Sequence, residues 1–310
     1  MSAGGEVAVL AIDGTALVAD AAARHGTAPT ASAALGRALI GALLLSCFKA
    51  EGEATQVTFR GDGPLGSLQA IATSDGRVKG RMDNPAADPP LRPDGKLAVG
   101  AAVGRGILAV VRSRVPPPPP GGGPAPPPPP PYTGLTQIVS GEVAADLAHY
   151  LATSEQTNCA LALGVSLDRG GRIASAGGFL VQVLPFCPDA ALERLEANLG
   201  ALPPVTELLG AGASPADLTA RVLAGLGTAP GAFSLTPTYG PCETADLRAR
   251  MVRAVALLGE DEVRDIVATQ GGLEVRCEFC RDVELFGEGE VLAAVEAARA
   301  AGAARLMGRE

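Results

Sequence analysis

The chain has 310 residues, 47% of them hydrophobic, and carries a formal net charge of −8. This hydrophobic content excludes an intrinsically disordered protein, and the length is sufficient for two domains. Because no block of Lys or Arg offsets the acidic balance, we expect no nucleic acid as a partner.

The first part of the chain is predicted to combine strands with one long buried helix. Residues 6–12 and 15–19 are strand-like, and Thr30 is expected to cap a helix that opens at Pro29. Apolar residues recur at helical spacing from Leu35 to Cys47, which predicts that most of this helix is buried. Further strands are expected at residues 56–59, 66–73, 76–82, 96–103 and 106–111.

A proline-rich segment, residues 116–131, interrupts this pattern. Prolines cannot donate the hydrogen bonds of a sheet, so the segment is expected to be extended, with a partly polyproline II conformation. Strand-like sequence resumes at Tyr132, which favours a loop insertion within one domain. A ligand for a groove-type partner is the alternative.

Beyond this insertion the chain is expected to complete its N-terminal domain and then change to short helices. Ser140 is predicted to cap a helix over residues 141–154, with strands at 160–167 and 178–184. From about residue 187 to 233 each predicted helix is too short to be stable alone in water. Among them, Ser214 and Pro215 form a typical helix start. This segment is either an ordinary helical linker or one that folds only conditionally.

The C-terminal part combines two predicted helices with a cysteine-containing turn. An amphipathic helix is expected from Leu247 to Leu258 and a shorter one over residues 260–269. Cys277 and Cys280 then form a C-x-x-C motif between strand-like residues 273–276 and 283–286. Both sulfurs are expected on the inside of a tight turn, which suits a tetrahedral metal ion or a disulfide. Such a small module has too little core to be robust unaided.

The remaining cysteines and both histidines are predicted to be structural. Cys47, Cys159 and Cys187 lie in or beside apolar segments and are expected to be buried. His25 and His149 are isolated in sequence from any cysteine, so each is expected to be hydrogen-bonded or solvated. No paired carboxylates, phosphate-binding loop or nucleophile–histidine arrangement is apparent, and we expect no enzyme.

Two other functions fit the C-x-x-C motif less well. A thiol enzyme would place its first cysteine at a helix N-terminus after a strand, whereas Cys277 is predicted to lie between strands. A zinc-ribbon interaction module could use Arg276 and Arg281 to bind RNA or a protein. These arginines are surrounded by Glu274, Glu278, Asp282 and Glu284.

Short motifs spread over most of the chain point to a family. They include residues 34–37 (ALGR), 61–66 (GDGPLG), 76–80 (GRVKG), 131–134 (PYTG), 140–144 (SGEVA), 154–156 (SEQ), 177–182 (GGFLVQ), 271–275 (GGLEV) and 277–280 (CEFC). In these motifs, and in their order, the chain resembles the 33 kDa chaperonin family of redox-regulated holdase chaperones.

The resemblance implies an α+β protein with four parts. These are a mixed sheet-and-helix N-terminal domain (1–185), a helical linker (186–233), a small zinc-ribbon-like redox domain (234–290) and a helical tail (291–310). In the family, four thiolates hold Zn²⁺ in the reduced, inactive state. Oxidation forms disulfides, zinc leaves and the linker loses structure. The exposed apolar surface then holds unfolding client proteins without ATP, under oxidative or heat stress.

The resemblance also implies the roles of the C-terminal cysteines. Cys242, Cys277 and Cys280 correspond to zinc ligands, and Cys277 with Cys280 corresponds to a redox-active disulfide pair.

One cysteine of the family pattern is missing from this chain. The first ligand pair of the family is C-x-C, and here Cys242 stands alone, with Gly240 or Thr244 in place of its neighbour. A water molecule or the carboxylate of Glu243 or Asp246 could complete a weaker zinc site. The alternative is a chaperone-like protein whose C-terminal module binds no zinc or does not respond to oxidants.

The expected cellular location follows from the cysteine content and from the family resemblance. The longest apolar run, residues 38–48, is too short to span a bilayer, and residues 1–9 lack the features of a signal peptide, so we expect no membrane. Six cysteines do not make a secreted disulfide scaffold in a chain of this length. The resemblance implies a cytoplasmic protein, or one of the chloroplast stroma if the source is a photosynthetic eukaryote, that binds unfolded clients and forms a homodimer on activation.

Overall fold

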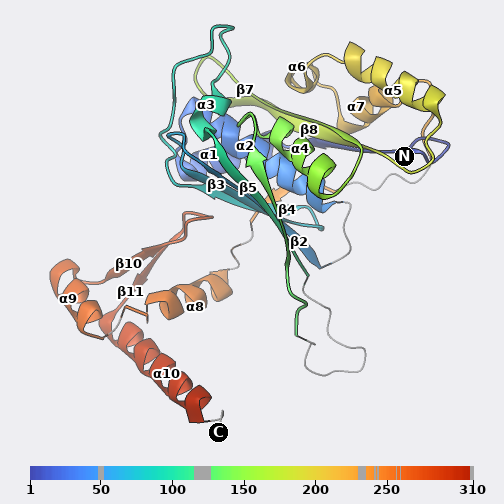
Figure 1. Ribbon diagram of the computed structural model, residues 1–310. Coiled ribbons are helices and arrows are strands. Elements are labelled where there is room, and N and C mark those ends of the chain that lie inside the picture. The colour runs from blue at the N-terminus through green and yellow to red at the C-terminus, as the bar shows by residue number, and fades with distance from the viewer. Residues whose placement is uncertain are drawn as a thin grey trace. The chain divides into compact units, whose positions relative to one another are not determined.

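The computed structural model describes residues 1–47, 52–114, 127–229, 235–240, 242, 244–255, 257–258 and 260–307, with the side chains of 244–246 and 298–307 left out. The chain divides into two compact units (Figure 1). Met1–Tyr239 is called the N-terminal unit and Gly240–Glu310 the C-terminal unit. Each is described by itself.

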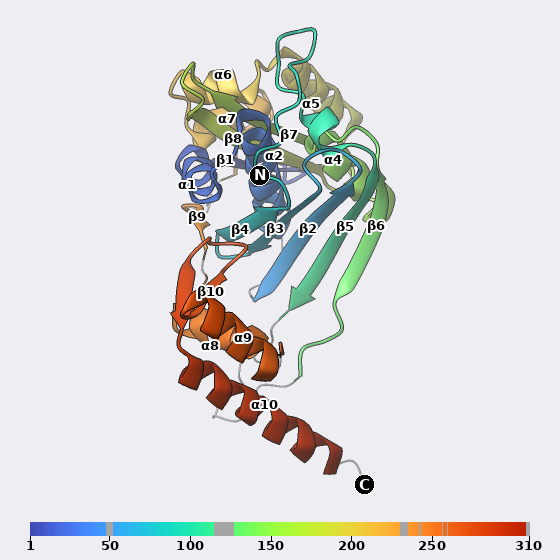
Figure 2. The ribbon, with the colours of Figure 1, turned by 90° about the vertical axis from the view of Figure 1, so that its left-hand side faces the viewer.

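The N-terminal unit contains two sheets. The first has three antiparallel strands in the order β1-β8-β7, which are β1 (Val7–Asp13), β8 (Ile173–Val183) and β7 (Cys159–Leu167). The second has the order β6-β5-β2-β3-β4-β9 (Figure 2). Its strands are β6 (Tyr132–Ile138), β5 (Gly106–Arg114), β2 (Glu53–Gly61), β3 (Ser67–Thr73), β4 (Arg77–Met82) and β9 (Thr238–Tyr239). Only the β4–β9 pair in this sheet is parallel.

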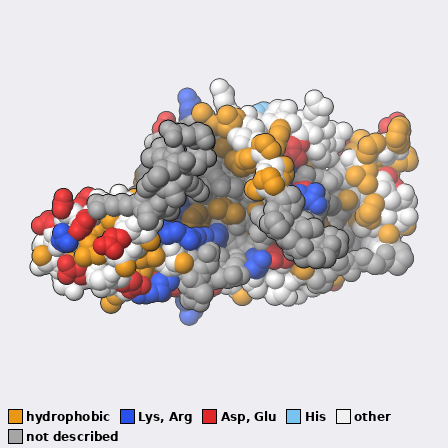
Figure 3. Space-filling model, turned by 90° about the horizontal axis from the view of Figure 1, so that it is seen from below, with side chains coloured by type: hydrophobic (Ala, Val, Ile, Leu, Met, Phe, Trp, Pro, Cys, Tyr) orange, Lys and Arg blue, Asp and Glu red, His pale blue; other side chains and the backbone are white. Residues whose placement is uncertain are grey.

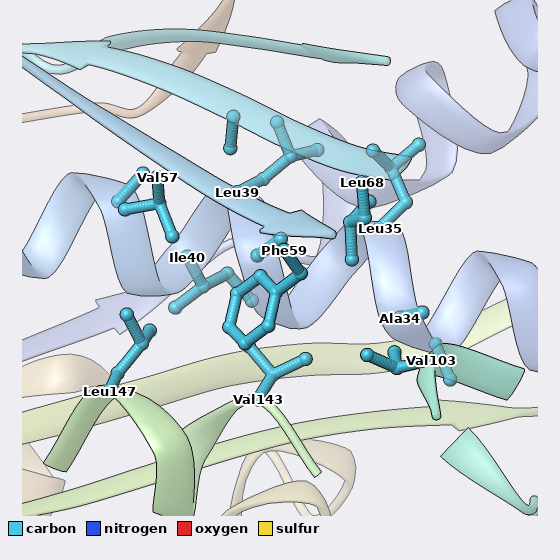
Figure 4. Close-up of a cluster of buried hydrophobic side chains, with 14 of the residues drawn as sticks. Ala34, Leu35, Leu39, Ile40, Val57, Phe59, Leu68, Val103, Val143 and Leu147 are labelled. Carbon is cyan, nitrogen blue, oxygen red and sulfur yellow. The ribbon is translucent and has the colours of Figure 1, made fainter. Parts of the chain in front are cut away.

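Helix α2 (Pro29–Ser46) lies between the two sheets and forms the centre of the core (Figure 4). Alternate residues of β3 and β4 point at it and are buried, as expected for strands with one buried face. The predicted burial of this helix is confirmed. It is long and apolar enough to cross a membrane, but 89% of its apolar window is buried inside the protein, as in a core helix.

Three sequence-based assignments in this unit are wrong. Residues 15–19 begin helix α1 (Thr15–His25), in which the buried Leu17, Val18 and Ala21 follow a helical period. Residues 96–103, predicted as a strand, contain the short helix α3 (Val99–Val103). Helix α4 (Ala144–Ser154) begins three residues later than predicted.

Neither predicted helix cap of the N-terminal domain is confirmed, because Ala28 and Val143 are the N-cap residues of α2 and α4, and no N-cap side chain accepts a hydrogen bond there. Asp88 accepts hydrogen bonds from the amide (3.1 Å) and hydroxyl (2.5 Å) of Thr30, and Ala28 is the N-cap of α2. Asp146 of α4 accepts from the amides of Val139 and Ser140, both at 2.8 Å. Of the proline-rich segment, residues 115–126 lie outside the described residues.

Three short helices cover the outer face of the three-stranded sheet. They are α5 (Asp189–Ala201), α6 (Val205–Gly210) and α7 (Pro215–Val222). A second hydrophobic cluster forms beneath them from Val7, Phe179, Val181, Leu195, Val205, Leu208, Leu209, Leu218, Val222 and Leu223. The predicted cap of α7 is confirmed, since Asp217 N–H donates to Ser214 Oγ (3.2 Å) and Ser214 N–H donates to the Asp217 carboxylate (2.8 Å).

The C-terminal unit packs three helices around a hairpin. Its elements are α8 (Thr244–Val255), α9 (Glu260–Gln270), β10 (Leu273–Arg276), β11 (Val283–Phe286) and α10 (Glu288–Met307). Its core consists of Leu247, Met251, Val255, Val263, Leu273, Cys280, Phe286, Val291 and Val295 among the described side chains. The two predicted helices and the hairpin are confirmed, but Leu258 lies beyond α8 and is 44% exposed.

Candidate metal centre

Three cysteine sulfurs converge in the C-terminal unit. Cys242 precedes α8, and Cys277 and Cys280 lie on the turn between β10 and β11. All three Sγ atoms lie within 4.8 Å of one another, and those of Cys242 and Cys277 are 3.7 Å apart. The predicted juxtaposition of the two cysteines of the C-x-x-C motif with Cys242 is therefore present.

The hairpin fixes the position of the C-x-x-C motif. Cys277 N–H donates to the carbonyl of Asp282 (2.9 Å), and Arg281 N–H donates to the carbonyl of Cys277 (3.0 Å). Arg281 has a φ of 63°, a left-handed conformation that is uncommon for a residue with a side chain and that closes the turn here. Cys280 is 5% exposed and belongs to the core of the unit, so the sulfur cluster is part of the packing.

The environments of Cys277 and Cys280 separate the pKa values of their thiols. Burial alone raises the pKa of Cys277. Hydrogen bonds from the backbone of Cys280 and Phe279 and from the other two thiols together lower it by more, so the pKa of Cys277 lies below its ordinary value. Burial also raises the pKa of Cys280, and its hydrogen bonds to the other thiols add to that increase. Without a cation, one thiolate is favoured and further negative charge is opposed. A bound divalent cation would reverse this preference.

The residues present fit a zinc ion in their donor type and spacing. Thiolate ligands select zinc among the common divalent ions, with a metal–sulfur distance of about 2.3 Å. Two ligands of a regular tetrahedron with that radius lie about 3.8 Å apart, and the Cys242–Cys277 separation of 3.7 Å is close to this value. None of the six cysteines, all of which the structure describes, forms a disulfide. Glu243 and the side chain of Asp246, the predicted carboxylate ligands, lie outside the described residues.

The profile of a protein family described as Hsp33 protein matches residues 1–286 of the chain. The chain belongs to the Hsp33 family. It is 40% identical to the 33 kDa chaperonin of Symbiobacterium thermophilum over 293 residues, which cover 94% of each chain. It is also 40% identical to the 33 kDa chaperonin of Geobacter sulfurreducens over 277 residues, covering 89% of this chain and 86% of that protein.

A solved Hsp33 structure has the same fold. The crystal structure of the 33 kDa chaperonin from Thermotoga maritima superposes with a TM-score of 0.81 at 31% identity, covering 95% of each chain. The predicted α+β fold and the predicted family are thereby confirmed. Members of the Hsp33 family are chaperones, and this class of function applies to the chain.

The cysteines outside the cluster are less buried than predicted. Cys47, Cys159 and Cys187 are each partly exposed, because each lies at the end of an element or on a partly covered strand. Of the two histidines, His149 is exposed on α4, and His25 is buried and lies 3.0 Å from the hydroxyl of Tyr239 through Nε2. Neither histidine belongs to the group of cysteine ligands.

Arg248 supports the centre from α8 and was not singled out from the sequence. Its guanidinium lies 4.5 Å from the ring centroid of Phe286, pairs with Glu284 and lies 2.8 Å from a carboxylate oxygen of Glu290. One side chain therefore ties α8 to β11 and α10. No periodicity marks it, because its partners are 36 and 42 residues away.

The arginines near the hairpin are offset by neighbouring acidic side chains. Arg276 lies 3.4 Å from Glu274, and Arg264 lies 2.6 Å from Glu260. Figure 3 shows acidic, basic and hydrophobic side chains interspersed on the surface of the C-terminal unit, at the left of the view. Such a mixed surface differs from the basic stripe that a nucleic-acid-binding module uses.

Proposed function

We propose that the chain is a redox-regulated, ATP-independent holdase chaperone in which Cys242, Cys277 and Cys280 hold Zn²⁺. The convergence of these three sulfurs within one small unit is the observation that carries the proposal. Zn²⁺ would neutralise the thiolates and add its binding free energy to the folding of the C-terminal unit. The small core of this unit makes that contribution important.

Oxidation would act on the cysteine pair Cys277 and Cys280. The two thiolates lose two electrons to a peroxide such as H₂O₂ and form a disulfide bond, and the peroxide O–O bond breaks and takes up two protons from solvent to give two water molecules. One thiolate, that of Cys242, then remains as a ligand, which is insufficient to retain the ion. The C-terminal unit loses the cross-link between the start of α8 and the hairpin.

The helices α5 to α7 are the segment whose release would create a client-binding surface. They have 13, 6 and 8 residues, too few for stability without tertiary packing. Beneath them lie Val7, Phe179 and Val181 on the outer face of the three-stranded sheet. Separation of these helices would expose contiguous apolar surface, which is the feature that unfolding polypeptides bind.

The proposal includes the partners and the location expected from the sequence. The partners are unfolded or partly unfolded client proteins, with a homodimer as the activated form. The bacterial 33 kDa chaperonins to which the chain is similar favour a cytoplasmic location. A plastid stroma would provide comparable reducing conditions.

Suppression of the aggregation of a chemically denatured client protein tests the proposed function. The zinc-loaded, reduced protein is expected to suppress aggregation weakly, and the same protein treated with peroxide at elevated temperature is expected to suppress it strongly, both without ATP. Equal suppression in the two states would favour the alternative, a chaperone whose C-terminal module has lost its switch. No suppression in either state would contradict a holdase.

A further inference from the structure

The last element of the N-terminal unit is a two-residue strand at the edge of the six-stranded sheet. In β9, Thr238 pairs with Arg77 and Tyr239 pairs with Val78, in parallel with β4. The Thr238 amide also donates to the carbonyl of Gly76 (3.1 Å). Only two residues separate Tyr239 from Cys242 along the chain, so the strand adjoins the proposed metal ligand.

Beyond β9, the hydroxyl of Tyr239 continues the hydrogen bonding along β4. It donates to the carbonyl of Gly80 (2.9 Å) and lies 3.3 Å from the Gly80 amide nitrogen, from which it accepts. His25 Nε2 lies 3.0 Å from the same oxygen, and the guanidinium of Arg24 lies 5.4 Å from the ring centroid. The Tyr239 hydroxyl thus satisfies both the amide and the carbonyl of Gly80, which the backbone of a neighbouring strand would otherwise do.

This arrangement covers an edge that could otherwise accept another strand. The unpaired amides and carbonyls of an edge strand are a template for any extended polypeptide. At β4 the template is covered by a two-residue ladder and the side chain of Tyr239, so few backbone hydrogen bonds must break before another segment can take this place.

We propose that the edge of β4 beneath β9 is a docking site for one extended segment of a non-native client polypeptide. Tyr239 keeps this site closed as long as the proposed metal centre holds Cys242, which is three positions beyond the end of the strand. When the centre is oxidised, Cys242 is released and the client segment replaces β9. This inference rests on the proposed holdase function and deepens it by naming a surface for the client.

The side chains of β4 indicate which client segments fit. Val78, Gly80 and Met82 face α2 and are buried, whereas Arg77, Lys79 and Arg81 lie on the opposite face. A strand added beside β4 also alternates between these two faces. Arg77 and Arg81 already pair with Asp75 (2.6 Å) and Asp83 (3.8 Å), so the opposite face is polar and mixed in charge. Segments with apolar residues on one face and polar residues on the other are therefore favoured.

Amide hydrogen exchange of the full-length protein, resolved by residue with NMR, tests the docking site. The Gly80 amide is expected to be protected in the reduced, zinc-loaded protein and to exchange about tenfold or more faster after peroxide treatment. Addition of a denatured client is expected to restore protection. If client is bound while the Gly80 amide stays unprotected, the inference is wrong and the holdase function stands. If the oxidised protein retains no client, both are wrong.

The substitution Tyr239→Phe tests the closing role of the hydroxyl without oxidant. It removes the hydroxyl hydrogen bonds and keeps the ring, so the Gly80 amide of the reduced protein is expected to exchange about fivefold to tenfold faster, with more client captured before oxidation. Tyr132→Phe is the matched control, because Tyr132 is 52% exposed at the start of β6. Unchanged exchange at Gly80 in the Tyr239→Phe variant would overturn the closing role.

Discussion

Cys280 is both a proposed ligand and a core residue, which distinguishes it from the other two cysteines of the centre. It is 5% exposed among the apolar side chains of the C-terminal unit, whereas Cys242 and Cys277 are partly exposed. Its removal therefore affects metal binding and packing together. At the scale of single residues, this coupling explains how sulfur chemistry can alter the stability of a whole unit.

The variant Cys280→Ser is expected to weaken zinc binding strongly. Removal of an outer-shell partner of a ligand typically costs about 10- to 100-fold in metal affinity, and the loss of a ligand itself should cost more. A neutral hydroxyl is a poorer ligand than a thiolate, and it leaves a polar group in the core. Competition with a chromogenic chelator measures the affinity. Cys187→Ser is the control, since Cys187 lies outside the cluster. Equal affinities in the two variants would exclude Cys280 as a ligand.

Arg248→Ala is expected to destabilise the C-terminal unit, seen as a lower denaturant concentration at the midpoint of its unfolding. The change removes the contact with the Phe286 ring and two partly exposed ion pairs. Chemical denaturation monitored by hydrogen exchange within α8 and α10 measures it. Arg253→Ala, on an exposed position of the same helix, provides the comparison and should cost much less.

At the scale of elements, the helix α7 combines tertiary packing with a capped first turn. The capping box of Ser214 and Asp217 satisfies amides that a helix of 8 residues would otherwise leave unpaired. Because α7 packs beside β1 through Leu218 and Val222, the cap also stabilises the cover of the three-stranded sheet.

Ser214→Ala is expected to destabilise α7 by about 1 kcal/mol and to lower the peroxide concentration at which client binding begins. The physical reason is that the helices α5 to α7 then separate from the sheet at a lower free-energy cost. Aggregation assays over a peroxide titration measure the shift. Ser113→Ala, at an exposed position of β5, is the matched control, and identical titrations for the two variants would contradict a role of α7.

Asp217 gives this cap a pH dependence. Hydrogen bonds from the Ser214 side chain and backbone hold the pKa of Asp217 below its ordinary value. A carboxyl whose pKa is lowered by folding stabilises the protein at neutral pH, and this contribution is lost as the pH falls through that pKa. The stability difference between the parent and Asp217→Asn, measured by urea denaturation, is therefore expected to stay constant above about pH 5 and to shrink as the pH falls below about 4, the ordinary range of an aspartate. A difference that stays constant in this lower range too would contradict the assignment.

Much of this element structure was predictable, and the exceptions have physical causes. The apolar stripe of α2 and the strand patterns of residues 66–73 and 76–82 are local signals, and both were confirmed. Residues 15–19 were predicted as a strand, but they begin a helix. Its helical period is visible only when Ala21, beyond these five residues, is included. The strand β9 has two residues, and its pairing with β4 depends on residues about 160 positions apart, which no local pattern reveals.

At the scale of the whole molecule, the two units differ in how far they depend on the cysteines. The N-terminal unit has two sheets around a buried helix, and the C-terminal unit has one small cluster that includes the thiol of Cys280. The sequence placed Cys277 and Cys280 together through the C-x-x-C motif, and the family resemblance added Cys242 to them. It could not predict Arg248 or Tyr239, since the partners of both are distant in the chain.

The zinc content per chain, measured before and after peroxide together with a count of free thiols, tests most directly whether the cysteines hold the C-terminal unit through a metal. The account predicts about one zinc ion per reduced chain, and its release in step with the loss of the Cys277 and Cys280 thiols. A reduced protein that binds no zinc, or one that retains zinc after these two thiols are oxidised, would contradict it.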